Sequence, residues 1–151
     1  MTTKTDAVDD QTYGGDFYDW TIKTSKLLRA GRFSVVDLEQ IAEEIEDMGK
    51  SNRRALSSYL KLLMAHLLKW HFQPSYRSIS WRLLISNARD EIQDLLKDSP
   101  SLNPKVEQLM ADRYAAACRR ASLETGLALE SFPSACPFSV EQLLDDEYFP
   151  D

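Results

Sequence analysis

The feature that most constrains the fold is an apolar stripe that repeats with helical periodicity between residues 37 and 74. At about 100° per residue the stripe stays within an arc of about 100°, which is typical of an amphipathic helix. Its phase continues through Gly49, where a helical glycine costs only about 1 kcal/mol relative to alanine. We therefore predict one helix of about 34 residues, roughly 50 Å long, and not a hairpin that reverses at Gly49. The stripe contains Ile41, Ile45, Met48, Asn52, Ala55, Leu56, Tyr59, Leu63, His66 and Trp70.

Charge divides the same region into two blocks of opposite sign. Residues 37–47 hold six acids and no base, and residues 50–89 hold eight bases and no acid. After Arg120 every charged residue is acidic, so acidic, basic and acidic blocks alternate along the chain. Such alternation is usually neutralised internally, which predicts that the acidic tail lies near the basic middle. The formal net charge of −6 weighs against general affinity for nucleic acid.

Length and composition indicate one ordinary globular domain. A chain of 151 residues can bury roughly two thirds of the surface that its unfolded state exposes. We predict a flexible polar lead over residues 1–12 and a single helical domain over residues 13–151. No apolar run reaches the roughly 18 to 20 residues that span a bilayer, and the N-terminus lacks the apolar core of a signal peptide. We therefore expect a cytoplasmic protein without a membrane segment.

Capping residues and glycines divide the rest of the chain into further helices. The apolar positions of the helix before residue 98 place Leu84 inside. The chain beyond residue 130 predicts a mostly extended segment with one short helix, which a capping box from Ser139 to Gln142 begins. We therefore predict an all-α helical bundle of about four main helices, with one long central helix and this C-terminal segment. The other three main helices are expected at about residues 16–30, 78–97 and 104–124.

Seven motifs follow one another along the chain: DFYDW, DLEQIAEEIEDMG, HLLKWHFQP, SISWR, DSPSL, ETGL and CPFSVEQLL. In this order they resemble the bacterial domain-of-unknown-function family twenty-nine, over about residues 13 to 150. The resemblance implies a small, mostly helical bacterial protein with no established activity. It implies no catalytic residue, because none is assigned in the family.

Glu44, Asn52 and His66 are the candidate polar residues of the long helix. Carboxylates and imidazoles bind metals in helical bundles, but Glu44 and His66 would lie about 33 Å apart on one helix. We therefore expect neither a metal nor a cofactor. For His66 we favour packing in the core, where the neutral ring donates one hydrogen bond to a buried acceptor. Asn52 would need partners if it were buried, and it could fix helix register or oligomeric state.

Three bases near the end of the long helix form a candidate anion-binding site. Lys69, Arg77 and Arg82 flank the turn into the next helix, whose N-terminus adds a partial positive charge. In the alternative interpretation, which we favour, these cations pair with the acidic tail.

Three hypotheses for function are compatible with these patterns. The leading one is a non-enzymatic protein–protein interaction module, in which the split charge of the long helix sets the orientation of a partner helix. A homodimer with antiparallel helices would place acidic halves on basic halves, so we expect a homo-oligomer or a protein partner. The second hypothesis is salt-sensitive nucleic-acid binding through residues 50–89, which the net charge disfavours. The third is a metal-dependent enzyme that uses His66 with carboxylates from another helix.

Overall fold

The structure is a computed structural model that describes residues 15–151, so the lead predicted over residues 1–12 lies outside the described residues. Within this range the regular structure is helical and no strand occurs, which confirms the all-α prediction. The chain divides into two compact units, one up to Lys50 and one from Ser51 to Asp151. The long helix α3 runs through both, and the single domain expected from the sequence stays a prediction. None of the described helices is long and apolar enough to cross a membrane.

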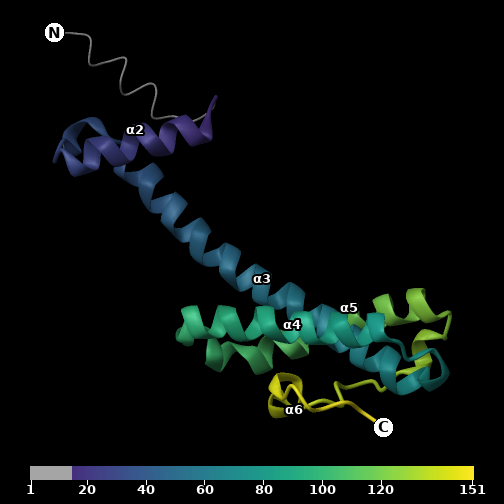
Figure 1. The fold of residues 1–151 in the computed structure, drawn as a ribbon. Coiled ribbons are helices and arrows are strands. Elements are labelled where there is room, and N and C mark those ends of the chain that lie inside the picture. Colours follow the sequence, from purple (N-terminus) through teal and green to yellow (C-terminus); the bar gives the residue numbers. More distant parts are fainter. Residues whose placement is uncertain (1–14) are drawn as a thin grey trace. The chain divides into compact units, whose positions relative to one another are not determined.

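The first unit contains α2 (Phe17–Arg29), the 3-10 turn η1 (Phe33–Val35) and the beginning of α3 (Figure 1). Asp16 caps α2, because its carboxylate accepts the N–H of Asp19 at 3.0 Å. The helix is followed by Gly31, whose φ of 74° lies in the left-handed region that side chains disfavour. Both ends agree with the sequence prediction.

The helix α3 (Leu38–Phe72) is continuous over 35 residues, so the prediction of one long helix is confirmed. The carboxylate of Asp37 accepts a backbone N–H of the first turn at 3.0 Å and caps the helix. Gly49 lies inside the helix with open space around its Cα. The helix stops before Pro74, which excludes a helical conformation for Gln73.

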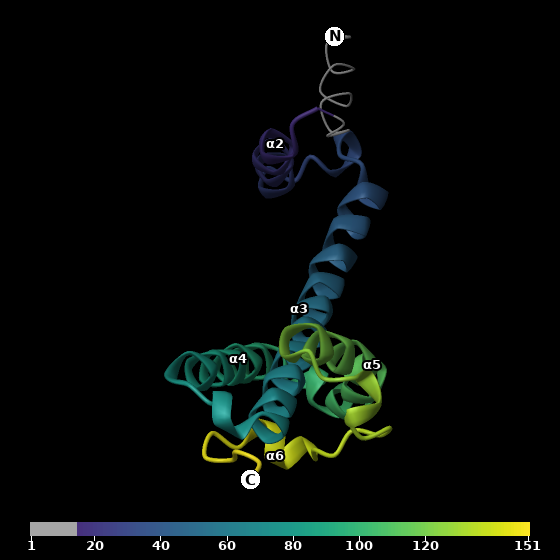
Figure 2. The ribbon, with the colours of Figure 1, turned by 90° about the vertical axis from the view of Figure 1, so that its right-hand side faces the viewer.

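In the second unit, α4 (Ile79–Asp98) and α5 (Val106–Thr125) flank the C-terminal half of α3 (Figures 1 and 2). The 3-10 helix η3 (Pro100–Lys105) separates them, so α5 begins slightly later than predicted. The prediction that Leu84 lies inside is wrong, because its side chain is exposed. The core that the three helices share includes Leu56, Leu60, Leu63, Leu67, Ile85, Ile92, Val106, Ala117 and Ala121.

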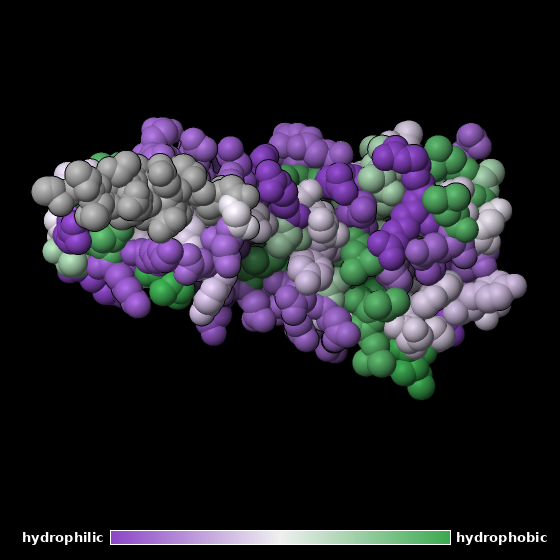
Figure 3. All heavy atoms as spheres, turned by 90° about the horizontal axis from the view of Figure 1, so that it is seen from above, coloured by the Kyte–Doolittle hydropathy of each residue, from purple (hydrophilic) through white to green (hydrophobic). Residues whose placement is uncertain are grey.

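The chain after α5 is mostly extended, as predicted. It contains the 3-10 turn η4 (Leu129–Ser131) and the short helix α6 (Val140–Leu144), which packs on α4. Another 3-10 turn, η2 (Pro74–Tyr76), lies earlier in the chain, between α3 and α4. The predicted capping box is present, since Ser139 and Gln142 each accept the other's backbone N–H. On the face drawn in Figure 3, hydrophobic side chains reach the surface in patches among hydrophilic ones.

Candidate interaction surface

The apolar stripe of α3 is buried in its second half and exposed in its first. From Leu56 onward most of its members face the core of the second unit. Before that point Ile45 is 59% exposed, Met48 is 63% exposed, and Asn52 is exposed as well. Among the described residues up to Lys50, the buried ones are limited to two residues of α2. The first unit therefore leaves most of its apolar side chains at the surface.

The predicted charge division lies on this exposed part of α3. We call residues 39–47 the acidic segment and residues 50–61 the basic segment. Three acids and three bases around their junction are exposed, and none of the six forms a salt bridge with any residue between 15 and 151. Around the junction, these six residues therefore keep opposite charges that no salt bridge neutralises. These residues are Glu43, Glu46, Asp47, Lys50, Arg53 and Arg54.

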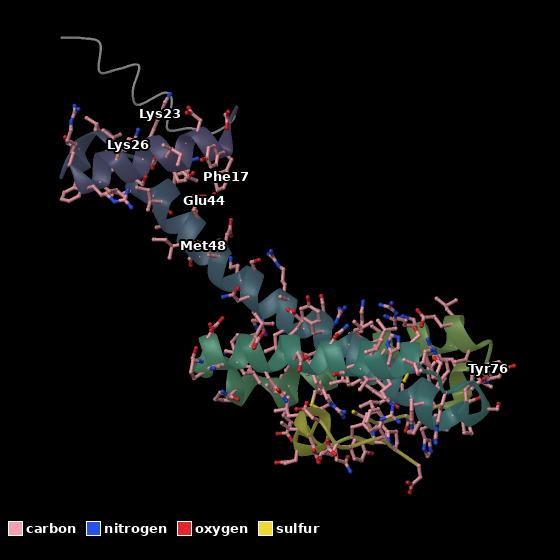
Figure 4. All side chains as sticks on the ribbon, viewed as in Figure 1. Phe17, Lys23, Lys26, Glu44, Met48 and Tyr76 are labelled. Carbon is pink, nitrogen blue, oxygen red and sulfur yellow. The ribbon has the colours of Figure 1, made fainter. Side chains whose placement is uncertain are left out.

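A small apolar pocket lies between α2 and the acidic segment. Its volume is about 210 Å³, and its α3 wall consists of Ile41, Glu44, Ile45 and Met48. Figure 4 shows three of the lining residues, which are Phe17 on α2 and, one turn apart on α3, Glu44 and Met48. Glu44 thus borders an apolar pocket of the first unit, whereas His66 belongs to the second unit.

His66 is 2% exposed, and its Nδ1 lies 2.9 Å from the carbonyl oxygen of Leu62. Because a carbonyl can only accept, Nδ1 carries the proton in this hydrogen bond. Burial lowers the pKa of His66, although the bond to Leu62 opposes this shift. The ring therefore packs as a neutral imidazole, which is the arrangement we favoured from the sequence. Within residues 15–151 no three His, Cys, Asp or Glu side chains form a group that could hold a metal ion.

Lys69, one of the three candidate anion-binding residues, pairs with the acidic C-terminal part of the chain. Its Nζ lies 2.7 Å from Oε1 of Glu124 and 4.7 Å from the ring centroid of Trp81. Arg120 donates to the other oxygen of Glu124 at 2.9 Å. Burial alone would raise the pKa of Glu124, but the hydrogen bonds from Lys69 and Arg120 outweigh it and lower this pKa. The buried ammonium group is thus neutralised within the protein.

Arg77 binds the C-terminal tail through backbone oxygens, and Arg82 contacts aromatic rings. Arg77 donates from Nε to the carbonyl oxygen of Trp70 at 2.8 Å, and from Nη2 to that of Asp151 at 2.8 Å. The guanidinium of Arg82 lies 5.3 Å from the ring centroid of Trp70 and 4.7 Å from that of Phe149, within cation–π range. Each of the three candidate cations therefore already has partners in the protein.

Arg89, which the sequence analysis did not single out, holds the end of α6. It is 1% exposed and donates to the carbonyl oxygens of Leu143 at 2.8 Å and Gln142 at 3.1 Å. One turn later on α4, Gln93 donates to the carbonyl of Leu144 at 3.1 Å. Carbonyls in the last turn of a helix lack partners within that helix. Two side chains of α4 therefore complete the C-terminus of α6.

Comparison with known proteins gives a family but no relative of known activity. Residues 12–149 match the family model described as "Domain of unknown function DUF29". Neither the curated proteins nor the solved structures gave a match. The family match agrees with the resemblance found in the motifs, and it leaves the function to be argued from the residues themselves.

Proposed function

The chain belongs to the family of the domain of unknown function DUF29, and we propose that it is a non-enzymatic protein–protein interaction module that pairs through α3. One observation carries this proposal. Ile45 and Met48 are exposed on the apolar stripe, at the junction of the acidic and the basic segment, where three exposed acids and three exposed bases form no salt bridge among the described residues. Exposed apolar residues with a charged rim are typical of protein interaction sites.

The partner that best fits these segments is a second copy of this chain, with its α3 antiparallel. An antiparallel pair brings each acidic segment against the basic segment of the other copy, whereas a parallel pair brings like charges together. The contact is then the same on both copies, as a two-fold axis requires.

The spacing of the stripe sets the register of this pair. When the two-fold axis crosses the helices at the level of residue 50, Met48 of one copy lies opposite Asn52 of the other. Ile45 then lies opposite Ala55 of the other copy. Apolar layers then continue on both sides of the axis. Asn52, close to the axis, costs some stability in this register, because it faces the apolar Met48.

The charged residues support the antiparallel orientation from outside the stripe. At 100° per residue, Glu46 and Arg53 lie about 110° to 130° from the centre of the stripe on one side, and Asp47 and Arg54 lie about 130° to 150° from it on the other. A two-fold axis between antiparallel helices places equal sides of the two copies next to each other. The acids of one copy therefore share a side of the pair with the bases of the other and attract them through solvent, without meeting across the stripe.

The expected affinity is modest, because the contact is short. Residues 45–55 extend over about 16 Å of helix, and each exposed ion pair contributes about 0.2 to 1 kcal/mol. We expect a weak dimer with a dissociation constant in the high micromolar range, on the order of −5 to −6 kcal/mol. Added salt should weaken it, because exposed charges are screened.

Sedimentation of charge-reversed variants tests this proposal. The wild-type chain should dimerise with rising concentration, whereas E46K/D47K and R53E/R54E should each remain monomeric. An equimolar mixture of these two variants should form a heterodimer, because one carries only bases and the other only acids at positions 46, 47, 53 and 54. The variant E91K/D94K makes the same charge change on exposed positions of α4 and should dimerise like the wild type.

Two outcomes would contradict the proposal. A wild-type chain that stays monomeric at every concentration would exclude self-pairing. Dimers that survive both reversals would place the contact elsewhere on the molecule.

A further inference from the structure

A second feature of the molecule, independent of α3, is a hollow of about 450 Å³ between α5 and residues 129–134. Tyr114, Cys118 and Phe132 line it and are themselves buried. The hydroxyl of Tyr114 donates to the carbonyl of Pro133 at 2.7 Å and so joins the two walls. The volume lies within the range of small-ligand pockets, roughly 300 to 1,000 Å³. The hollow is therefore large enough for a small molecule, and its walls are held together.

Two opposite charges border this apolar hollow. Arg119 lies on α5 and Glu130 lies on η4, and both side chains are exposed. Neither forms a salt bridge within the described part of the chain. A guanidinium group binds a carboxylate through two parallel hydrogen bonds, and a carboxylate accepts hydrogen bonds from an ammonium group. The border of the hollow thus offers contacts to a ligand that carries one anionic and one cationic group.

We propose that this hollow binds a free α-amino acid with a large apolar side chain. Arg119 binds the carboxylate of the ligand and Glu130 its ammonium group, while the side chain lies against Tyr114 and Phe132. A purely apolar ligand would gain nothing from the two charged residues, which would stay hydrated. A residue inside a peptide has neither charge, so the same contacts discriminate against an inserted protein segment.

Calorimetric titration with L-tryptophan and its blocked analogues tests the proposal. N-acetyl-tryptophan lacks the ammonium group, tryptophan amide lacks the carboxylate, and N-acetyl-tryptophan amide lacks both. The free amino acid should bind most tightly, and each missing charge should weaken binding by up to about fivefold, because an exposed ion pair contributes about 0.2 to 1 kcal/mol. Equal binding of the doubly blocked analogue would indicate a pocket for a peptide side chain and would overturn the proposal.

Variants of Arg119 and Glu130 test which group of the ligand each residue binds. R119Q should remove the preference for tryptophan over its amide and keep the preference over the N-acetyl analogue, and E130Q should do the opposite. A115F, on the wall of the hollow, should fill it and abolish binding. K97Q and E107Q change exposed charges elsewhere and should leave the affinity unchanged. Absence of binding of any analogue at millimolar concentration would also overturn the proposal.

Discussion

Replacing Arg89 by methionine keeps much of the buried side-chain volume but removes the donors that complete α6. The guanidinium is 1% exposed, and its Nε and Nη2 bind the carbonyls of Leu143 and Gln142. Methionine has no donor, and no other side chain is seen donating to these two oxygens among the described residues. The substitution therefore leaves the end of α6 without its side-chain partner.

The size of the effect follows from these contacts. Loss of a charged donor to the buried carbonyl of Leu143 costs about 1 to 3 kcal/mol. The carbonyl of Gln142 contributes less, about 0.5 to 1.5 kcal/mol, because it also accepts the N–H of Asp145 at 3.4 Å. Burial of the guanidinium lowers the pKa of Arg89, which shows a desolvation cost that methionine avoids. The net destabilisation should be about 2 kcal/mol.

Urea unfolding, followed by both tryptophan fluorescence and circular dichroism, measures this difference. The control is Lys97→Met, which removes an exposed base of the same helix and should change stability by less than about 0.5 kcal/mol. Backbone amides of α6 should also exchange faster in the Arg89→Met variant than in the control. Equal stability of Arg89→Met and Lys97→Met would refute the role assigned to the guanidinium.

Two further effects can be measured with the same unfolding assay. Stability should fall as the pH drops below about 6.5, because the lowered pKa of buried His66 lets the unfolded chain bind a proton before the folded chain does. His66→Phe should reduce this slope, and an unchanged slope would contradict the assignment. Gly126→Ala should cost about 1 kcal/mol because φ is 79° there, whereas Gly49→Ala, in open space within α3, should stabilise by about 0.5 to 1 kcal/mol. Destabilisation at Gly49 would show that α3 needs the glycine.

The ends of the helices could be predicted because they depend on neighbouring residues. Asp16 and Ser78 cap α2 and α4 through a backbone N–H three residues later, and a capping box begins α6. Gly31 and Gly126 adopt the left-handed conformation that ends a helix. Each of these signals lies within one turn of the boundary that it sets, so no knowledge of tertiary contacts was needed.

Burial of the stripe could not be predicted in the same way. Its period does not change between Ile41 and Trp70, yet the stripe is covered mainly from Leu56 onward. Periodicity fixes the direction in which side chains point, but the covering helices α4 and α5 come from distant sequence. The point near Leu56 where the covered part begins therefore follows from these tertiary contacts and not from the residues of the stripe.

The buried Arg89 was missed because the basic block was interpreted only as a charged surface. Arg89 lies four residues after Ile85 and three before Ile92, both of which are fully buried. This spacing places the guanidinium on the apolar face of α4 and was a usable signal. Its partners could not be found, since the carbonyls of α6 lie more than fifty positions later in the chain. The hollow beside Arg119 also needs two separate segments, so spacing alone does not predict it.

The central claim, antiparallel self-pairing of α3, is tested most directly by disulfide trapping between single-cysteine chains. In a background with Cys118 and Cys136 replaced by alanine, one chain carries Met48→Cys and the other Asn52→Cys. With the two-fold axis at Lys50, these positions face each other only between copies. We predict a disulfide-linked dimer in the mixture under mild oxidation, and monomers when either chain is oxidised alone. Linked dimers of each chain alone, without preference for the mixed species, would indicate parallel helices and would contradict the proposal.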